Sequence, residues 1–363
     1  MRNHPGTPPT TTTTRVRRRV RCTLPGRPRQ PGRSGLDTAW AAEDLAARDP
    51  ELAALDTGLL LAPPGPDMAA TPIILDLDIG GDPDDAFTLA CAARLPELRL
   101  VLTSDEIDGQ RARLARHFLD LLGRPDVVVV AGADLGNRRY WVADNLTPTT
   151  VPAQPGDVID AVRAVCARAH GPVRWVGCGP MSNLARILRV LPELSGRLVI
   201  TQMGGALHYR DPTRAEHNAR LDPAAVRFVA ITARYLTLVL SDVTFTDEIA
   251  IGPHPADPGH AVYQALAAPN APAWGRLLAE HLDRWAAAFD GRTSKQHDPL
   301  TLTVALGLSF IYPARVPIVF ATDGRLRADS SGVPVTVALA ADYAAFCRWL
   351  TVQLGLPCTW HYP

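Results

Sequence analysis

Five aspartates lie within ten residues of one another, at Asp76, Asp78, Asp82, Asp84 and Asp85. Carboxylates so close together repel one another strongly unless a cation neutralises them. Oxygen ligands of this kind suit a hard ion, Ca²⁺ or Mg²⁺. The cluster therefore predicts a site for a divalent metal. The alternative is a solvated acidic turn that only caps a helix.

The residues on either side of this acidic segment show which elements would hold it. An apolar run, Ile73 to Leu75, comes directly before it, and an apolar-periodic stretch starts at Ala86. This order predicts a buried strand, a tight turn with a glycine pair and a proline, and a helix. In open α/β sheets, ligands bind at the carboxyl ends of strands, where this turn would lie. A fully apolar strand leading straight into the acids favours a functional site.

Further polar groups recur where a predicted strand ends or a predicted helix begins. They are Ser182-Asn183, Glu216 with Asn218, Asp222-Pro223, and His297-Asp298 before Pro299. Each one alone is more readily explained as a helix cap or a solvated residue. A hard cation, however, takes about six to eight oxygens, more than one strand end supplies. We therefore expect distant segments of the chain to complete the site.

Strand and helix patterns alternate from residue 72 onward. The strand patterns cover 73–75, 99–103, 127–131, 173–176, 198–203, 235–240, 316–320 and 333–338. The helix patterns cover 109–122, 157–169, 183–191 and 260–290, with further helices starting at 297 and 341. Alternation of this kind predicts an α/β fold with an open, largely parallel, Rossmann-like sheet and helices on both faces.

The N-terminal part differs in composition from the rest. Residues 1–36 carry nine arginines and no acid, with proline, glycine and threonine runs, and predict a disordered basic leader. A basic arm for nucleic acid or an anionic membrane is the functional alternative, and Met68 offers a later start. Residues 37–70 predict a helical extension and linker, broken at Pro63-Pro64-Gly65-Pro66, and residues 71–363 predict the main folded domain.

Composition narrows the class of protein. The chain has 363 residues, 47% hydrophobic and 20% charged, as in an ordinary globular protein. After residue 36 it carries 28 basic and 37 acidic residues, which argues against a nucleic-acid-binding surface. Six scattered cysteines without a Cys-x-x-Cys pair predict buried free thiols, and no apolar stretch reaches transmembrane length. We expect a cytoplasmic protein with no nucleic-acid or membrane partner.

Taken in order, the motifs resemble those of the nucleoside hydrolases, the Ca²⁺-dependent N-ribohydrolases of the inosine/uridine-preferring type. The resemblance spans residues 72–310 and rests on five motifs, namely Asp76-x-Asp78-x-Gly80 with Asp84-Asp85-Ala86, Gly179-Pro180-Met181-Ser182-Asn183-Leu184-Ala185, Met203-Gly204-Gly205-Ala206, Glu216-His217-Asn218 with Asp222-Pro223-Ala224-Ala225, and His297-Asp298-Pro299. It implies an enzyme that hydrolyses the N-glycosidic bond of a ribonucleoside to free base and ribose, in nucleoside salvage, as a homodimer or homotetramer.

The same resemblance implies a role for each residue. Ca²⁺ would be held by Asp78, Asp85, Asp298 and the main-chain carbonyl of Ser182, with Asp76 in support behind them. Asp78 would also take the proton from the Ca²⁺-bound water. His297 would serve the leaving base. Contacts to the ribose would come from Asp84, Met203, Glu216, Asn218 and Asp298.

The chemistry is consistent with these residue types. Cleavage of an N-glycosidic bond passes through an oxocarbenium-like state, which nearby carboxylates and ribose-hydroxyl hydrogen bonds stabilise. A metal makes water more acidic and orients it, and a carboxylate accepts the proton. The chain shows no Ser or Cys nucleophile pattern, so direct displacement by water fits best. The aromatics expected to reach the base are Tyr140, Trp141, Tyr209 and Trp285.

Three departures from the family pattern bear on the sugar and the base. The acidic turn is two residues longer than the commonest form, so either Asp82 or Asp84 could take the role given to Asp84. Ser104-Asp105-Glu106 replaces an Ala-Gly-Asn that would contact ribose, and His217 replaces an aromatic residue.

Two rival interpretations remain, and a third is excluded. A phosphatase using Asp76-x-Asp78 would want a lysine for the phosphate, and Lys295 is the only lysine in the chain. An EF-hand loop is excluded, because position 12 counted from Asp76 is Phe87 where a glutamate is required. A catalytically inactive ribose- or nucleoside-binding protein is the other interpretation that remains.

Overall fold

The computed structural model describes residues 70–308, 310–356 and 360. The predicted leader, 1–36, and residues 37–69 of the predicted extension lie outside the described residues. The described residues all belong to one compact unit of the chain, Leu36–Pro363.

The first strand, β1 (Ile73–Leu77), is buried along its whole length. Ile73, Leu75 and Leu77 face one hydrophobic core, and Ile74 faces a second core on the other side of the sheet. Successive side chains of a strand point to opposite faces, so a continuous apolar run is what a strand covered on both sides requires.

Nine strands form the central sheet, in the order β10-β9-β11-β6-β5-β4-β1-β2-β3. The other strands are β2 (Leu98–Thr103), β3 (Val128–Ala131), β4 (Val173–Gly177), β5 (Leu198–Met203), β6 (Tyr235–Val239), β9 (Ile311–Phe320), β10 (Leu326–Ala328) and β11 (Val333–Ala341). All neighbouring pairs from β3 to β11 are parallel, whereas β9 pairs antiparallel with β11 and β10. The predicted largely parallel α/β sheet is confirmed.

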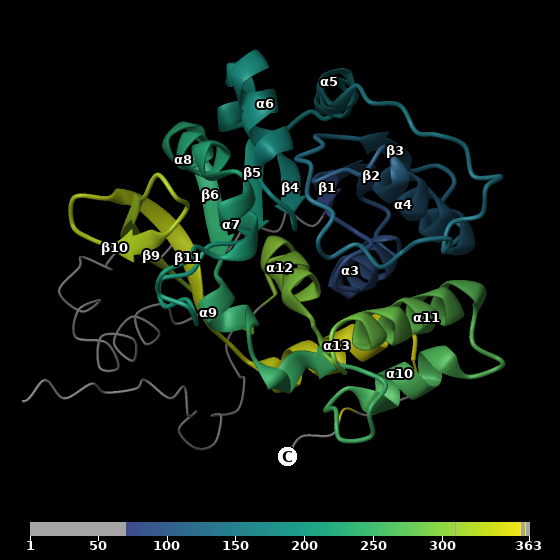
Figure 1. Cartoon of the computed structure of the whole chain (residues 1–363). Coiled ribbons are helices and arrows are strands. Elements are labelled where there is room, and N and C mark those ends of the chain that lie inside the picture. The colour runs from purple at the N-terminus through teal and green to yellow at the C-terminus, as the bar shows by residue number, and fades with distance from the viewer. Residues whose placement is uncertain (1–69, 309, 357–359, 361–363) are drawn as a thin grey trace, which may run out of the picture. The chain divides into compact units, whose positions relative to one another are not determined.

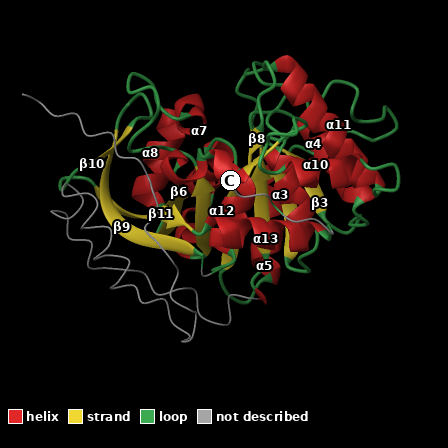
Figure 2. Ribbon diagram, turned by 90° about the horizontal axis from the view of Figure 1, so that it is seen from below, coloured by secondary structure: helices red, strands yellow, loops and turns green. Residues whose placement is uncertain are grey.

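Helices cover both faces of this sheet (Figures 1 and 2). One core contains side chains of α3 (Asp84–Ala92), α4 (Gln110–Leu121), α10 (His260–Ala267), α11 (Ala273–Ala288), α12 (His297–Ala305) and α13 (Tyr343–Leu354). The other contains side chains of α5 (Val158–Arg168), α6 (Ser182–Val190) and α8 (Pro223–Thr232). Among the described helices, none is both long and apolar enough to cross a membrane.

Several short elements connect these layers and were not predicted. They are α7 (His217–Leu221), α9 (Ser241–Thr244), the 3₁₀ turns Pro192–Gly196 and Asp247–Ile249, and a two-stranded pair of β7 (Ala250–Ile251) and β8 (Ser294–Lys295). Elements of two to five residues carry too few side chains for a periodic pattern.

Strand order reverses at β1, because the chain runs from β1 to β2 and β3 on one side and from β4 to β6 on the other. In the register of β1 with β4, Asp76 lies opposite Gly177. Asp78 and Cys178 therefore follow the carboxyl ends of two adjacent strands. A strand-order reversal of this kind is where open α/β sheets bind ligands.

Helix α11 contacts the acidic turn through a histidine that is completely buried. The His281 Nε2 atom donates a hydrogen bond to the Gly81 carbonyl at 3.0 Å. Burial lowers the pKa of His281 to about 4, with the Gly81 hydrogen bond opposing that shift. The side chain is therefore neutral in the native protein at pH 7.

This histidine predicts a pH-dependent loss of stability. Its folded pKa lies below its unfolded value of about 6.5, so the stabilisation is complete above pH 6.5 and is lost as pH falls toward 4. Relative to His281→Gln, which keeps an amide donor for Gly81, the wild type should lose about 3 kcal/mol of unfolding free energy between pH 7 and pH 4. Urea denaturation of both proteins at each pH measures the difference. Parallel pH curves would contradict the assignment.

Candidate active site

A cavity of about 150 Å³ lies at the carboxyl ends of β1, β4, β5 and β6. Asp78, Cys178, Met203 and Ser241, which line it, lie at or just beyond the ends of these four strands. The structure brings eight of the predicted site residues to its wall, namely Asp78, Asp84, Asp85, Met203, Glu216, Asn218, His297 and Asp298. Asp76 and Ser182 do not line it.

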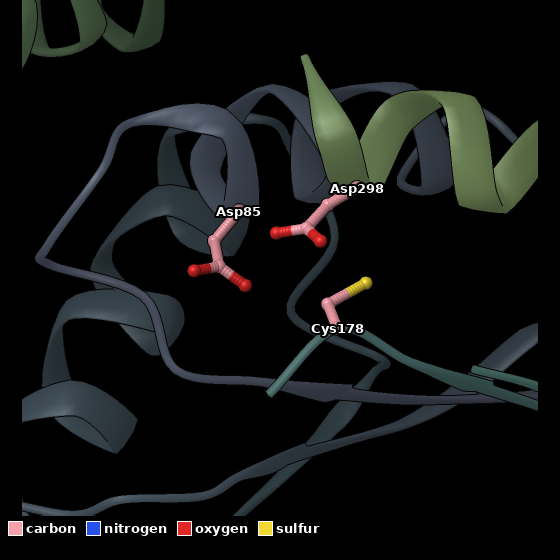
Figure 3. A group of neighbouring side chains, drawn as sticks. All are labelled: Asp85, Cys178 and Asp298. Carbon is pink, nitrogen blue, oxygen red and sulfur yellow. The ribbon is translucent and has the colours of Figure 1, made fainter. Parts of the chain in front are cut away.

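Two carboxylates from different helices meet at the base of this cavity. Asp85 in the first turn of α3, Asp298 in the first turn of α12 and Cys178 after β4 each offer one potential ligand atom, all within 4.8 Å of one another. Figure 3 shows the two carboxylates facing each other beside the cysteine. The Asp78 backbone N–H donates to Asp85 Oδ1 at 3.3 Å, which joins the turn to α3.

The carboxylates carry more negative charge than their surroundings balance. Burial, followed by repulsion from neighbouring carboxylates, raises the pKa of Asp84 and Asp298 well above the usual range. Burial likewise raises the pKa of Asp85 well above that range, with the Asp78 charge the next cause. It raises the pKa of Asp78 to about 6, against the opposing charge of Arg111. Buried acids in this state fit a divalent cation, which would restore their ionised form.

The donor atoms are oxygens, although a cysteine stands among them. Burial and the nearby carboxylates raise the pKa of the Cys178 thiol well above its ordinary value. A thiol binds metal as the thiolate, so this side chain is a poor ligand here. Its main-chain carbonyl is a hard oxygen and accepts a hydrogen bond from Asn218 Nδ2 at 2.7 Å. The set of donors matches Ca²⁺ or Mg²⁺ rather than a softer ion.

The structure places Ser182 differently from the sequence-based expectation. Its hydroxyl donates to Asp222 Oδ2 at 2.6 Å, and Asp222 in turn caps α8 by accepting from the Ala225 N–H at 2.9 Å. Ser182 therefore joins α6 to α8. The residue that emerges into the cavity from β4 is Cys178, because the strand ends at Gly177.

Asp76 lies behind the cavity in a fixed hydrogen-bond network. Asn183 Nδ2 donates to Asp76 Oδ1 and to the Thr103 carbonyl, both at 2.9 Å, and Asn183 Oδ1 accepts from the Ala133 N–H at 2.9 Å. One buried amide thus ties together the ends of β1 and β2 and the segment after β3. The sequence suggested only a helix start at Asn183. A sequence alone does not distinguish an asparagine that caps a helix from one whose buried amide connects three segments.

Arg111 is a second residue that sequence reasoning missed. It is 2% exposed and lines the cavity, donating to the carbonyls of Asp78 and Ile79 and pairing with Asp105 Oδ2 at 3.3 Å. Its Nε also donates to the Asp105 carbonyl at 2.6 Å. Arg111 therefore fixes the backbone from which the Asp78 side chain projects. It stands in an arginine-rich helix, where each arginine looks like an ordinary surface residue.

Removal of this guanidinium should destabilise the protein strongly. Arg111→Met removes the charge that pairs with the buried Asp105 carboxylate, which keeps only its hydrogen bond from Asn137, and the donor of three main-chain carbonyls. Breaking a buried pair from one side costs about 3–5 kcal/mol. Chemical denaturation should show a loss of this order. The double variant Arg111→Met/Asp105→Asn should recover part of it, since no buried charge is then left alone. A loss in the single variant below about 1 kcal/mol would contradict this role.

Another part of the cavity wall is built on α7 and its N-terminal cap. Glu216 caps this helix by accepting from the N–H groups of Asn218 and Ala219, at 3.1 and 3.2 Å, and also accepts from the Gly205 N–H at 2.8 Å. Three backbone donors hold the carboxylate in one orientation at the cavity wall. The Asn218 amide also lies 3.4 Å from Met203 Sδ.

Asp82 and Asp84 are the two candidates for the aspartate that contacts the ribose. Both line the cavity, but their surroundings differ. Asp82 accepts a hydrogen bond from the Ser294 hydroxyl. The Asp298 backbone lowers the pKa of Asp84 by hydrogen bonding, against the dominant effect of burial. Asp84 is therefore the one that stands with the Asp85 and Asp298 carboxylates.

His297 stands at the cavity wall between a hydroxyl and an aromatic ring. Its Nδ1 lies 2.7 Å from Thr244 Oγ1, and its ring stacks on Phe245 with centroids 6.0 Å apart. Burial, and then the charges of Lys295, Arg292 and Arg210, lower the pKa of His297 to about 3. The imidazole is therefore neutral at pH 7.

Three of the four predicted aromatics, Tyr140, Tyr209 and Trp285, line the cavity, and Phe245 joins them. Trp141 instead packs against the acidic turn and donates from Nε1 to Asp144 at 2.7 Å. At Gly80, with φ of +108°, an added Cβ would lie 2.3 Å from the Trp141 ring. Only glycine fits this position, which explains Gly80, the first glycine of the pair in the turn.

Comparison with known proteins identifies the family. A family model of the inosine-uridine preferring nucleoside hydrolases matches residues 73–348. The chain belongs to this family. The family that the motifs resemble is thus confirmed, over a longer stretch than the motifs themselves cover.

Relatives of known function and solved structure agree with this nucleoside hydrolase assignment. The pyrimidine-specific ribonucleoside hydrolase RihA of Photobacterium profundum is 31% identical over 194 residues, which are 49% of this chain and 63% of that protein. The chain thus matches less than two thirds of that relative's length. The purine-preferring ribonucleoside hydrolase of Gardnerella vaginalis has a TM-score of 0.64 at 23% identity, over 78% of this chain and 98% of that one. A plant nucleoside hydrolase, PpNRh1, has a TM-score of 0.65 at 22% identity, over 79% and 100%.

Proposed function

We propose that this chain hydrolyses the N-glycosidic bond of a ribonucleoside to give free base and ribose. The observation that carries the proposal is the meeting of Asp85 and Asp298 at the wall of a cavity that Asp78, Glu216 and Asn218 also line. Membership of the nucleoside hydrolase family supports it. So do the names of the relatives, which act on pyrimidine or purine ribonucleosides.

In this proposal, Ca²⁺ is held by Asp78, Asp85, Asp298 and a main-chain carbonyl. The carbonyl is that of Cys178, which replaces Ser182 in this role because only Cys178 lines the cavity. Bound there, the cation supplies positive charge and makes a water molecule more acidic. Asp76, held by Asn183, supports the strand end from behind.

Asp78 is the proposed general base. It is half-buried at the cavity wall, its pKa is raised to about 6 mainly by burial, and it is ionised above that pH. A carboxylate with a pKa near the working pH accepts a proton from water more readily than an ordinary aspartate. The same carboxylates stabilise the positive charge that develops on the sugar as the bond to the base breaks.

The ribose is proposed to lie between the acidic base of the cavity and the α7 wall. Asp84, Asp298, Glu216 and Asn218 would accept from or donate to its hydroxyls, and Met203 would pack against the sugar. Because three backbone N–H groups fix Glu216, its carboxylate is already oriented before the substrate binds.

His297 is proposed to serve the leaving base as a hydrogen-bond donor. If the Thr244 hydroxyl donates to Nδ1, the proton of the neutral imidazole lies on Nε2. An N–H at this position can donate to the departing base and stabilise its negative charge. Tyr140, Tyr209, Phe245 and Trp285 would surround the base.

A panel of nucleosides tests this proposal. Adenosine, inosine, guanosine, uridine, cytidine and their 2′-deoxy forms are incubated with the enzyme, and free base and reducing sugar are both measured. At least one ribonucleoside should release base and ribose in equal amounts, and faster than its 2′-deoxy form, which lacks a hydroxyl for the acidic wall. Binding of nucleosides without release would instead indicate a catalytically inactive binding protein.

The preference for calcium, the place in nucleoside salvage, the homodimer or homotetramer and the cytoplasmic location stay predictions of the sequence.

A further inference from the structure

The cavity that contains the acidic cluster is also lined by unpaired arginines. Arg111 pairs with Asp105, and the other arginines of the lining are Arg210, Arg214, Arg220 and Arg292. Within the described part of the chain, none of these four forms an ion pair with a carboxylate. Arg220 donates to the Ala215 carbonyl at 3.1 Å, and Arg210, Arg214 and Arg292 are exposed. A neutral nucleoside carries no anion that these arginines could bind.

Two of these guanidinium groups are positioned by aromatic rings of the same cavity. The Arg210 guanidinium lies 4.3 Å from the Phe245 ring centroid and 4.6 Å from that of Tyr209. The Arg292 guanidinium lies 5.3 Å from the Trp285 ring centroid. Stacking fixes the plane of a guanidinium while its N–H groups stay available in that plane.

The positive charge of these side chains reaches into the cavity. Burial, and then the charges of Arg220, Arg111, Arg139 and Arg210, lower the pKa of His217 to about 4. The cavity therefore contains acidic side chains at the strand ends and cationic side chains that act on His217 and His297. A ligand that satisfies both groups bears hydroxyls for the first and an anion for the second.

We propose that the preferred substrate of this cavity is a ribonucleoside 5′-monophosphate, whose phosphate is bound by Arg210, Arg214 and Arg292. Planar guanidinium groups bind phosphate oxygens in pairs, and arginines that no carboxylate occupies are free to do so. This inference rests on the proposed function, in which the acidic side chains hold the 2′- and 3′-hydroxyls. The 5′ carbon then faces away from the acids.

The same N-glycosidic bond breaks in the monophosphate as in the nucleoside. The oxygen of water bonds to C1′, the N-glycosidic bond breaks with its electron pair going to the base, and the base takes up a proton. The products are free base and ribose 5-phosphate. Water is the only co-reactant.

The experiment compares matched pairs of substrates at low ionic strength. kcat/KM is measured for uridine 5′-monophosphate against uridine, and for inosine 5′-monophosphate against inosine. The monophosphate should be favoured at least about tenfold in one pair, as a charge-assisted hydrogen bond predicts. Raising the salt from about 0.02 to 0.2 M should shrink this ratio, because exposed charges are screened.

Arginine variants locate the effect. Arg210→Gln and Arg292→Gln should each lower the ratio of monophosphate to nucleoside kcat/KM about tenfold. Arg189→Gln is the matched control, since Arg189 is also exposed and stacks on an aromatic ring, Phe228, at 4.3 Å, but lies on α6 away from the cavity. This control should leave the ratio unchanged. Ratios at or below one, or equal ratios in all three variants, overturn the inference.

Two further arms separate the alternatives. Orotidine carries its anion on the base, and a preference for orotidine over uridine 5′-monophosphate places the anion on the base and overturns the assignment to the 5′ position. Calorimetric titration of uridine 5′-monophosphate and uridine into the Asp78→Asn variant, which the proposal makes inactive, measures binding without turnover. Tighter, Arg210-dependent binding of the monophosphate with no hydrolysis of either by the wild type supports the inference while the proposed function fails. Hydrolysis of nucleosides with equal binding of both overturns the inference while the proposed function stands.

Discussion

Asp78→Asn is expected to lower kcat at least about 10³-fold on every substrate, because this side chain is proposed both to accept the proton of water and to hold the metal. Natural nucleosides and a nitrophenyl riboside should be affected alike, since activation of water is common to both. Steady-state kinetics on the two substrates measures the effect. An exposed aspartate on α4, Asp120, gives the control Asp120→Asn, which should retain wild-type rates.

The same substitution should not weaken the metal-free fold. Repulsion from Glu216 and Asp105 adds to the burial that raises the pKa of Asp78, and asparagine removes one charge from this group. The melting temperature of the variant in chelator should therefore equal or exceed that of the wild type. A variant that is inactive and also much less stable would indicate a structural role for Asp78. A fall in kcat on uridine but not on the nitrophenyl riboside would show that Asp78 does not activate water.

His297→Ala is expected to separate the two halves of the reaction. A purine or pyrimidine leaves badly with both bonding electrons unless a donor stabilises it, and such a donor contributes about 10²–10⁴-fold. The variant should lose this factor on natural nucleosides and little on a nitrophenyl riboside, whose leaving group needs no proton. The measurement is kcat on the two substrates.

Thr244→Val supplies the matched variant for His297. It removes the hydroxyl 2.7 Å from His297 Nδ1 at nearly constant volume, so the imidazole loses its fixed orientation and proton position. Thr244→Val should lower kcat less than His297→Ala does, and only on natural nucleosides. Equal slowing of both substrates by His297→Ala would mean that His297 positions the ribose or the neighbouring Asp298 and that the leaving base is served by another group.

The parts of the fold that could be predicted are those with a local cause. An apolar run indicated β1, and a periodic apolar pattern indicated α3. The carboxylates between them indicated a concentration of negative charge that a cation would neutralise. β9 was shorter in the prediction, 316–320, than in the structure, Ile311–Phe320. The first residues of β9 include Pro313, and a proline in a sequence pattern counts against a strand. An antiparallel strand near the sheet edge accommodates this proline.

The parts of the site that could not be predicted depend on register and burial. Ser182 and Cys178 lie four residues apart on one turn, and only the pairing of Asp76 with Gly177 shows which of them follows the strand into the cavity. Arg111 and Asn183 look like ordinary helix residues until the neighbouring strand ends are in place. Trp141 was expected at the base because it is aromatic and near the turn, whereas it fills the space that Gly80 leaves open.

A calcium titration of the metal-stripped enzyme tests the central claim most directly. Base release from the best nucleoside is followed while Ca²⁺ is added back, and Ca²⁺ binding is measured in the same samples by equilibrium dialysis. Activity should be absent without metal and should rise in proportion to the occupancy of one site per chain, and Asp298→Asn should weaken both together. Full activity in the stripped enzyme, or a bound calcium that leaves the rate unchanged, would contradict a metal-dependent hydrolysis at Asp78, Asp85 and Asp298.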